Sequence, residues 1–434
     1  TREAIFPHDS HLHATTDHQT CPPAANSRTF PGDRHRSGSE ATASPMGSSS
    51  SMSSPAEAPA AAAAPAAPEA AEAAGPGASV AVLGLSGETI TTKSVGPKVS
   101  IRELKAGFPP CVLTWEGRTL KNGETVQALG WSGEVTVHMV VKSPDLHTSA
   151  ELLRKITSSR TQADFDADQL MILCYYAKEQ MLKEPTLLEL SPPLVIVAHL
   201  TGRLDQLNKI FDSCGDVPET KYLFLGNLVD RGQQGLDVLV LLLSLKLRHS
   251  SRLHLLRGRH ECGSISRIYG FYDECKKRSN VKVWRAFINF FDAMPICALI
   301  NHRIFCVASG LSPELQDLEQ IRQLRRPMDV PDMGLLTDLL WSDPEKEVTG
   351  WNDQDKGVSY TFGADVVQKF LKDHDLDLIV RGNQVVEEGY EYFAERLVSL
   401  FSVADFCGEF DNIGAVMLVD ENLEHSFKSW KRAA

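Results

Sequence analysis

The sequence lacks a surplus of positive charge. Its 44 lysines and arginines are outnumbered by 56 aspartates and glutamates, which leaves a net charge of −12 and an isoelectric point near 5.6. Proteins that bind nucleic acids in general carry a basic face that neutralises phosphates. The composition therefore argues against a general nucleic-acid binder.

The sequence also lacks a disulfide framework and a membrane-length apolar run. None of its nine cysteines forms a CxxC pair, and Cys306 lies in an apolar stretch. This usage is typical of reduced thiols inside the cell, so we expect a cytoplasmic or nuclear protein. The longest mostly apolar run, Leu236–Leu245, is too short to span a bilayer and predicts a buried helix.

Residues 1–77 contain few apolar side chains other than alanine. A serine run occupies Ser48–Ser51, and Pro55–Pro76 is rich in alanine and proline. Such a segment cannot bury enough surface to offset its backbone entropy, so we predict a disordered low-complexity tail. Met46–Ser51 also fits the N-myristoylation pattern, although a serine run matches it easily. If translation starts at Met46, Gly47 would carry the acyl anchor, and a mass spectrum of the native N-terminus would decide this.

Residues 78–143 have the pattern of a small sheet with one helix. Strands are predicted in Ala78–Gly87, Glu88–Ser94, Leu113–Leu120 and Val135–Val141. Apolar residues at helical spacing occupy Val99–Phe108, between the second and third strands. This order resembles the β-grasp fold of ubiquitin-like domains, so residues 78–143 are predicted to form one.

The resemblance to ubiquitin bears on partners. Lys142–Pro144 follows the last strand where ubiquitin ends in Gly-Gly, so conjugation is not expected. Thr114 takes the place of the isoleucine at the centre of ubiquitin's recognition patch, whereas Leu85 and Val140 keep the edges of that patch. Contact with ubiquitin receptors and a plain structural role both remain open.

After residue 149 the chain carries a helical lead-in to Leu190, and then β-rich segments alternate with helices. Five short segments stand out in this part of the chain. They are VIVAHLTG at Val195–Gly202, GNLVDRG at Gly226–Gly232, RGRHE at Arg257–Glu261, VASGLSP at Val307–Pro313 and VRGNQ at Val380–Gln384. In order and spacing they resemble the GDxHG, GDxVDRG, GNHE, HGG and RAHQ blocks of the PPP family of Ser/Thr protein phosphatases, most closely the catalytic subunit of protein phosphatase 1.

The resemblance implies an α/β fold over residues 149–430, a metallophosphatase-like β-sandwich flanked by helices. It also implies two divalent metals, manganese or iron and zinc, held at six ligand positions. Here those positions hold His199, Thr201, Asn227, Arg259, Ala308 and Asn383. Two close dications need carboxylate or imidazole donors, and an arginine repels them. We therefore expect no bound metal and no metal-activated hydroxide.

Other catalytic positions of the family are retained. By resemblance His260 is the general acid, Asp230 orients it and Arg231 clamps phosphate, while Lys356 takes the place of a second phosphate-binding arginine. Arg231, Arg259 and Lys356 could thus hold a phosphoryl group. Alternatively, His260 is merely structural, and Arg259 turns outward to an acidic neighbour.

Three functions remain open. The first is a pseudophosphatase that acts as a protein-binding scaffold or decoy, the second an active Ser/Thr phosphatase with a rebuilt metal site, and the third a phosphate-binding module. The scaffold would use the family's groove for RVxF-type peptides, which needs no metal. The matching positions are Ile304, Leu378, Tyr392, Leu423 and Phe427. Plain core packing by these residues is the alternative.

Overall fold

A computed structural model describes residues 78–83, 89–105, 111–141, 150–155, 163–355 and 357–431. They fall into two compact units, a smaller one within residues 78–138 and a larger one that contains the chain from Met139 onward. The tail predicted at residues 1–77, with Gly47, lies outside the described residues.

The smaller unit is a five-stranded sheet with the strand order β2-β1-β5-β3-β4. Its strands are β1 (Ala78–Leu83), β2 (Thr89–Val95), β3 (Cys111–Trp115), β4 (Arg118–Thr119) and β5 (Gly133–Val141), and α1 spans Ile101–Leu104. In the middle of the sheet β1 pairs antiparallel with β2 and parallel with β5. Residues alternate between buried and half-buried along β1, as expected for a strand with one face on a core.

The larger unit is built on two sheets. One has the order β16-β17-β15-β11-β10-β6 and the other β19-β18-β7-β8-β9. The strands of the first are β6 (Leu187–Leu190), β10 (Cys297–Ile300), β11 (Ile304–Val307), β15 (Leu378–Arg381), β16 (Tyr390–Phe393) and β17 (Leu397–Leu400). Those of the second are β7 (Leu194–Val197), β8 (Tyr222–Phe224), β9 (Leu253–Leu255), β18 (Gly414–Val419) and β19 (His425–Trp430).

One apolar cluster joins the two sheets face to face. It contains Ile196 and Leu223 from the five-stranded sheet and Cys306 and Val380 from the six-stranded sheet, all fully buried. The predicted sandwich is therefore confirmed. Leu187–Leu190, which the helical lead-in was predicted to include, is instead strand β6, because the preceding helix ends at Lys183 and these residues pair with β10.

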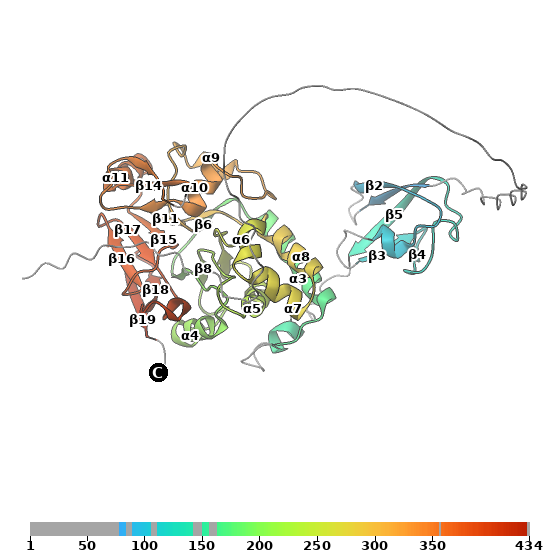
Figure 1. Ribbon diagram of the computed structural model, residues 1–434, viewed down its shortest axis with the longest axis horizontal. Helices are drawn as coiled ribbons and strands as arrows, with labels where there is room; N and C mark the ends of the chain where they lie inside the picture. The colour runs from blue at the N-terminus through green and yellow to red at the C-terminus, as the bar shows by residue number, and fades with distance from the viewer. Residues whose placement is uncertain are drawn as a thin grey trace, which may run out of the picture. The chain divides into compact units, whose positions relative to one another are not determined.

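Helices cover the outer face of each sheet (Figure 1). The helices that share a core cluster with the five-stranded sheet are α3 (Ala167–Lys183), α4 (Leu204–Cys214), α5 (Gly235–Arg248), α7 (Phe271–Arg278) and α8 (Val281–Phe291), and α6 (Gly263–Ile268) adjoins α7. Those on the six-stranded sheet are α9 (Glu319–Arg322), α10 (Leu335–Trp341) and α11 (Ala364–Asp373). The predicted buried helix over Leu236–Leu245 is α5, whose residues are nearly all buried.

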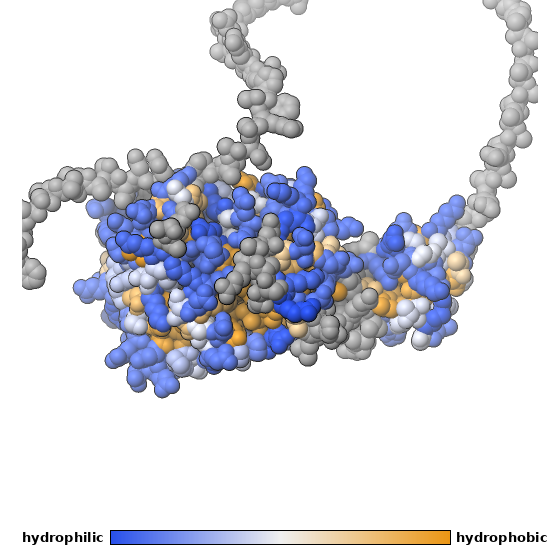
Figure 2. Space-filling model, turned by 90° about the horizontal axis from the view of Figure 1, so that it is seen from below, coloured by the Kyte–Doolittle hydropathy of each residue, from blue (hydrophilic) through white to orange (hydrophobic). Residues whose placement is uncertain are grey.

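No described helix combines the length and the apolar character that a membrane span requires. The face of the molecule seen in Figure 2 is largely hydrophilic, with apolar residues in groups between the polar ones.

The five sequence segments meet because of this topology. Each segment lies at the carboxyl end of one of the strands β7, β8, β9, β11 and β15. In one sheet β7, β8 and β9 are parallel neighbours, and in the other β11 and β15 pair in parallel. Ligands of α/β proteins bind at the carboxyl ends of such strands. The fold thus places the candidate site in loops at this end of the sandwich.

Candidate functional site

A cavity of about 690 Å³ opens at these strand ends. It is lined by four of the six ligand positions predicted from the family, His199, Thr201, Arg259 and Asn383. Arg231 and His260 line it too, beside aromatic walls that include Trp341, Tyr269, Phe401 and Phe406. The other two positions, Asn227 and Ala308, are buried and are not among the lining residues. Lys356 lies outside the described residues.

The backbone at the site is held in an unfavourable conformation. Left-handed φ values occur at four of the six ligand positions, His199 (60°), Thr201 (44°), Asn227 (55°) and Asn383 (76°). For a β-branched residue such as Thr201 this region is a genuine outlier. Strained residues persist only where the surrounding structure fixes them, and they cluster at functional sites.

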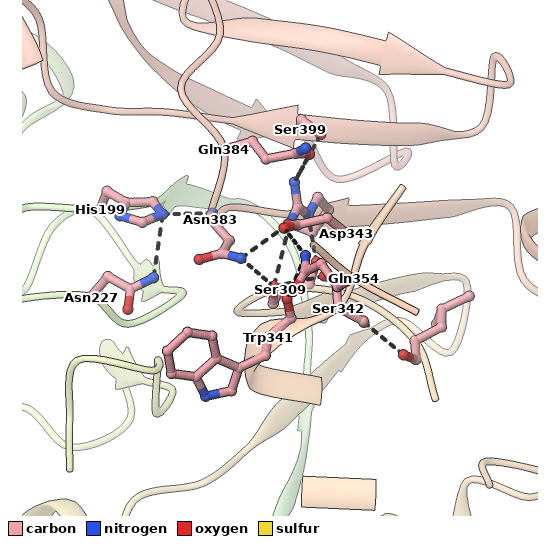
Figure 3. Close-up of polar contacts among 12 residues, drawn as sticks. His199, Asn227, Ser309, Trp341, Ser342, Asp343, Gln354, Asn383, Gln384 and Ser399 are labelled. Carbon is pink, nitrogen blue, oxygen red and sulfur yellow. Dashed lines mark hydrogen bonds and ion pairs between the residues drawn. The ribbon is translucent and has the colours of Figure 1, made fainter. Parts of the chain in front are cut away.

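His199 is held as a neutral hydrogen-bond acceptor. Its Nε2 accepts the backbone N–H of Asn383 at 2.5 Å and lies 3.3 Å from the amide nitrogen of Asn227 (Figure 3). Burial lowers the pKa of His199 well below its usual value, and the nearby Arg259 and His260 lower it further. A backbone N–H can only donate, so the imidazole proton is on Nδ1 and the Nε2 lone pair is occupied.

Asn383 is oriented by a polar network that sequence reasoning missed. Its amide nitrogen donates to Ser309 Oγ at 2.7 Å and to Asp343 Oδ1 at 3.0 Å, and Asp343 is also ion-paired with Arg381. These two acceptors direct the amide oxygen of Asn383 toward His199 and Asn227, and this buried oxygen has no partner among the described residues (Figure 3). A pairing of such distant residues leaves no local signal in the sequence.

Glu261 holds the loops after β8 and β9 together. Its buried carboxylate accepts the backbone N–H groups of Asn227, Leu228 and Gly258 at 2.7–2.8 Å. The amide oxygen of Asn227 accepts the N–H of His260 at 3.2 Å. Burial raises the pKa of Glu261, whereas the three backbone hydrogen bonds oppose that rise.

Asp230 and His260 form a buried pair. Asp230 Oδ2 lies 2.7 Å from His260 Nδ1, and Asp230 Oδ1 accepts the backbone N–H of Phe271 at 2.9 Å. Burial raises the pKa of Asp230 to about 7 and lowers the pKa of His260 well below its usual value. His260 therefore presents a neutral ring whose Nδ1 is occupied and whose other nitrogen, Nε2, is left toward the cavity.

Two guanidinium groups face the same cavity, each with an aromatic ring against it. Arg231 lies 4.2 Å from the ring centre of Tyr269, and Arg259 lies 5.0 Å from that of Trp341. The buried Nε of Arg259 has no hydrogen-bond partner among the described residues. The alternative in which Arg259 turns outward is wrong, because it lines the cavity and Glu261 binds backbone groups instead.

The fold implies two divalent metals, but these residues do not fit them. The described residues contain no group of three or more His, Cys, Asp or Glu side chains that could hold an ion. The Nε2 of His199 and the amide oxygen of Asn227 already accept N–H groups. Arg259 adds a fixed positive charge to the same cavity, and dications need anionic or imidazole donors.

The chain matches the family described as calcineurin-like phosphoesterase over residues 145–387, more than half of its length. The chain belongs to the calcineurin-like phosphoesterase family. It is also similar to the solved structure of a protein serine/threonine phosphatase from Saccharomyces cerevisiae, itself described as similar to human phosphatase PP5. That likeness has 25% identity and a TM-score of 0.62, and it covers 66% of this chain and 96% of the other.

A further match is a cold-active protein-tyrosine phosphatase from a psychrophilic Shewanella species. Its identity is 15% and its TM-score 0.41, with 57% of this chain and 83% of that chain covered. The metallophosphatase fold predicted from the motifs is therefore confirmed by the family match and the yeast phosphatase.

The five predicted docking residues also lie together. Ile304 and Leu378 are buried in the inter-sheet cluster, and Leu423 and Phe427 pack against it half-buried. Tyr392 is 41% exposed, and its ring lies 6.2 Å from that of Phe427. Sequence reasoning missed Tyr390, whose ring stacks on the ring of Phe427 with 3.7 Å between the ring centres.

In the smaller unit, Thr114 lies half-buried on β3. Leu85 and the side chain of Val140 lie outside the described residues, so the ubiquitin-like patch stays a prediction.

The buried neutral state of His199 predicts how stability depends on pH. Below about pH 6.5 the unfolded chain binds a proton at this residue and the folded chain does not, so the free energy of unfolding falls as pH falls. His199→Gln keeps an acceptor for the Asn383 N–H but cannot titrate. We expect urea unfolding between pH 6.5 and 5 to show a pH slope that is smaller in this variant, by up to about 1.4 kcal/mol per unit at the acidic end. The exposed His302→Gln is the control, and equal slopes in all three proteins would contradict the neutral assignment.

Proposed function

We propose that this chain is a PPP-type pseudophosphatase, which binds phosphoryl groups without metal-dependent hydrolysis and serves as a protein-binding scaffold. The observation that carries the proposal is the guanidinium of Arg259, which lines the cavity where the fold family holds metal and has an unpartnered Nε. A buried donor without a partner is unfavourable by about 1–3 kcal/mol, more when charged. Because the guanidinium lines the cavity, its fixed charge would attract an anionic ligand.

The arginines support a phosphoryl ligand in particular. The guanidinium of Arg231 lies over the ring of Tyr269, and that of Arg259 lies over the ring of Trp341. These contacts restrict the rotation of each guanidinium and so fix the directions of its N–H groups. Guanidinium forks match phosphate oxygens in bidentate fashion. In this proposal Lys356 would add a third positive charge, as the family resemblance implies.

The scaffold part of the proposal rests on surfaces away from the cavity. β16 and β19 are edge strands of the two sheets, and Tyr392 and Phe427 place aromatic side chains there. An extended RVxF-type peptide could add to such an edge and bury its alternate side chains. His425, whose Nε2 lies 2.6 Å from the hydroxyl of Tyr392, makes this groove more polar than the family pattern.

The smaller unit would provide a second surface for protein partners. A five-stranded sheet with β1 and β5 parallel in its middle supports a ubiquitin-like domain over residues 78–143. We propose that Thr114, on β3, marks the centre of its recognition face. The proposed location is the cytoplasm or nucleus, with an acyl anchor at Gly47 if translation starts at Met46.

The alternative is an active metal-dependent Ser/Thr phosphatase with a rebuilt metal site. The Asp230–His260 pair and Arg231 favour it, because the same residue types serve hydrolysis in the family. It requires His199 and Asn383 to ligate a metal, and His199 would first have to release the backbone N–H of Asn383.

Metal retention separates the two functions. Purified protein incubated with excess manganese and then dialysed should keep well below one equivalent of metal, because no carboxylate occupies the six ligand positions. Turnover of p-nitrophenyl phosphate should not rise with added manganese. Elemental analysis and a colorimetric assay measure both. Two retained metals per chain, or a metal-dependent activity that Asp230→Asn abolishes, would favour the active enzyme.

Phosphate binding tests the role of Arg259. Millimolar phosphate should raise the melting temperature, because a ligand of the folded state stabilises it by mass action. Arg259→Asn should weaken the phosphate Kd about tenfold or more, since a charge-assisted hydrogen bond contributes about 1.5–3 kcal/mol. Arg267→Asn removes the same charge from an exposed position outside the cavity and should bind like the wild type. Equal Kd values in all three proteins would mean that Arg259 takes no part.

Docking is tested with a peptide of RVxF type. It should bind the full chain weakly, and Phe427→Ala should remove about 2 kcal/mol or more of the binding free energy, as for a central aromatic anchor. Calorimetry with the exposed Lys428→Ala as control measures this. If the wild type does not bind the peptide, the aromatic cluster only packs the sheet edge.

A further inference from the structure

The Asp230–His260 pair, taken together with the two arginines, has the parts of a phosphoryl acceptor. We propose that His260 accepts a phosphoryl group on Nε2, without metal, from an acyl phosphate. The inference rests on the proposed function, because the arginines that bind phosphate would hold the group being transferred. It adds a covalent step that binding alone does not require.

The ring of His260 is fixed as a nucleophile by its neighbours. Nδ1 faces Asp230 Oδ2 at 2.7 Å, and Asp230 is itself held by the N–H of Phe271. The edge of Tyr269 packs on the ring, with centroids 5.7 Å apart at 69°. No described residue hydrogen-bonds to Nε2, so its lone pair is available to a ligand in the cavity that His260 lines. Histidine in this state is a competent covalent nucleophile.

Two guanidinium groups, Arg231 and Arg259, line the same cavity as this nucleophile and act on it electrostatically. Arg231 stacks on Tyr269, the same ring that packs on His260, so these two side chains are neighbours. Arg259 precedes His260 in the chain and lines the same cavity with an unpartnered Nε. Preorganised donors of this kind stabilise the charge that develops on a transferring phosphoryl group.

The transfer balances without a metal or an added proton. The Nε2 lone pair forms the N–P bond while the P–O bond to the acyl group breaks, and its electron pair leaves with the carboxylate. Above the raised pKa of Asp230, about 7, Nδ1 keeps its proton and its hydrogen bond to the Asp230 carboxylate, whose negative charge stabilises the cationic ring of the phosphohistidine. The products are one N-phosphorylated His260 and one free carboxylate.

The acidic side chains that line the cavity indicate which phosphoryl donor the site would use. The carboxylates that line the cavity among the described residues are Glu345 and Glu391, and Glu391 forms an exposed ion pair with Lys346 at 2.7 Å. Neither is a buried acid poised to protonate an alkoxide. An acyl phosphate suits such a site, because its leaving carboxylate is stable without protonation.

The experiment uses the full chain in EDTA with acetyl phosphate. Intact mass and peptide mapping should show one phosphoryl group on His260, labile in acid and stable in base. His260→Asn should abolish the label, whereas the exposed His302→Asn should label like the wild type. Asp230→Asn should slow labelling by about 10²-fold or more, because the tautomer is no longer fixed. Asp230 is a positioning residue, so its variant should still gain melting temperature from phosphate.

The outcomes separate this inference from the proposed function. Phosphate binding with no label on His260, or with label only on exposed side chains, would overturn the covalent step and leave the binding function standing. A chain that neither binds phosphate nor becomes labelled would overturn both. If His260→Asn does not fold, retention of label in folded Asp230→Asn at the wild-type rate overturns the inference instead.

Discussion

The buried carboxylate of Glu261 is the interaction on which the site depends. It binds three backbone N–H groups, two in the loop after β8 and one in the loop after β9. The two loops touch closely there, since a Cβ on Gly226 would lie 2.3 Å from the backbone nitrogen of Gly258. A buried charge is tolerated only when fully hydrogen-bonded, and this one is satisfied by backbone alone. The shape of the cavity therefore does not require a metal to hold its loops together.

His199, Asn227 and Asn383, at three of the predicted ligand positions, fit one another rather than an ion. Asn227 has an amide nitrogen within reach of His199 Nε2 and an amide oxygen that accepts the N–H of His260. An aspartate at residue 227 could only accept, so it would set a negative oxygen against the occupied lone pair of His199. Asn383 supplies the other N–H to that lone pair. Restoring a single family ligand would thus break hydrogen bonds before it could bind a metal.

Sequence reasoning found the fold and most of the site because five short motifs resemble the blocks of the PPP phosphatase family. That resemblance assigned His199, Arg259 and Asn383 to one site, and the topology brings the strand ends that precede them together. Two features had no such signal. Strand β6 continues the apolar pattern of a helix and becomes a strand only by pairing with β10. Asp343 orients Asn383 from a residue 40 positions away in the chain.

An unpartnered buried donor and left-handed backbone both carry an unfavourable free energy at this cavity. Arg259 is half-buried and loses part of its hydration, and its buried Nε has no hydrogen-bond partner among the described residues. Left-handed backbone at His199 and Thr201 adds an unfavourable contribution of about 1–3 kcal/mol per residue. Substitution by apolar residues would remove the first of these penalties, and ordinary loop geometry would remove the second. If phosphate binds at Arg259 as we propose, it would offset part of these penalties, and the free energy of unfolding would rise with phosphate concentration.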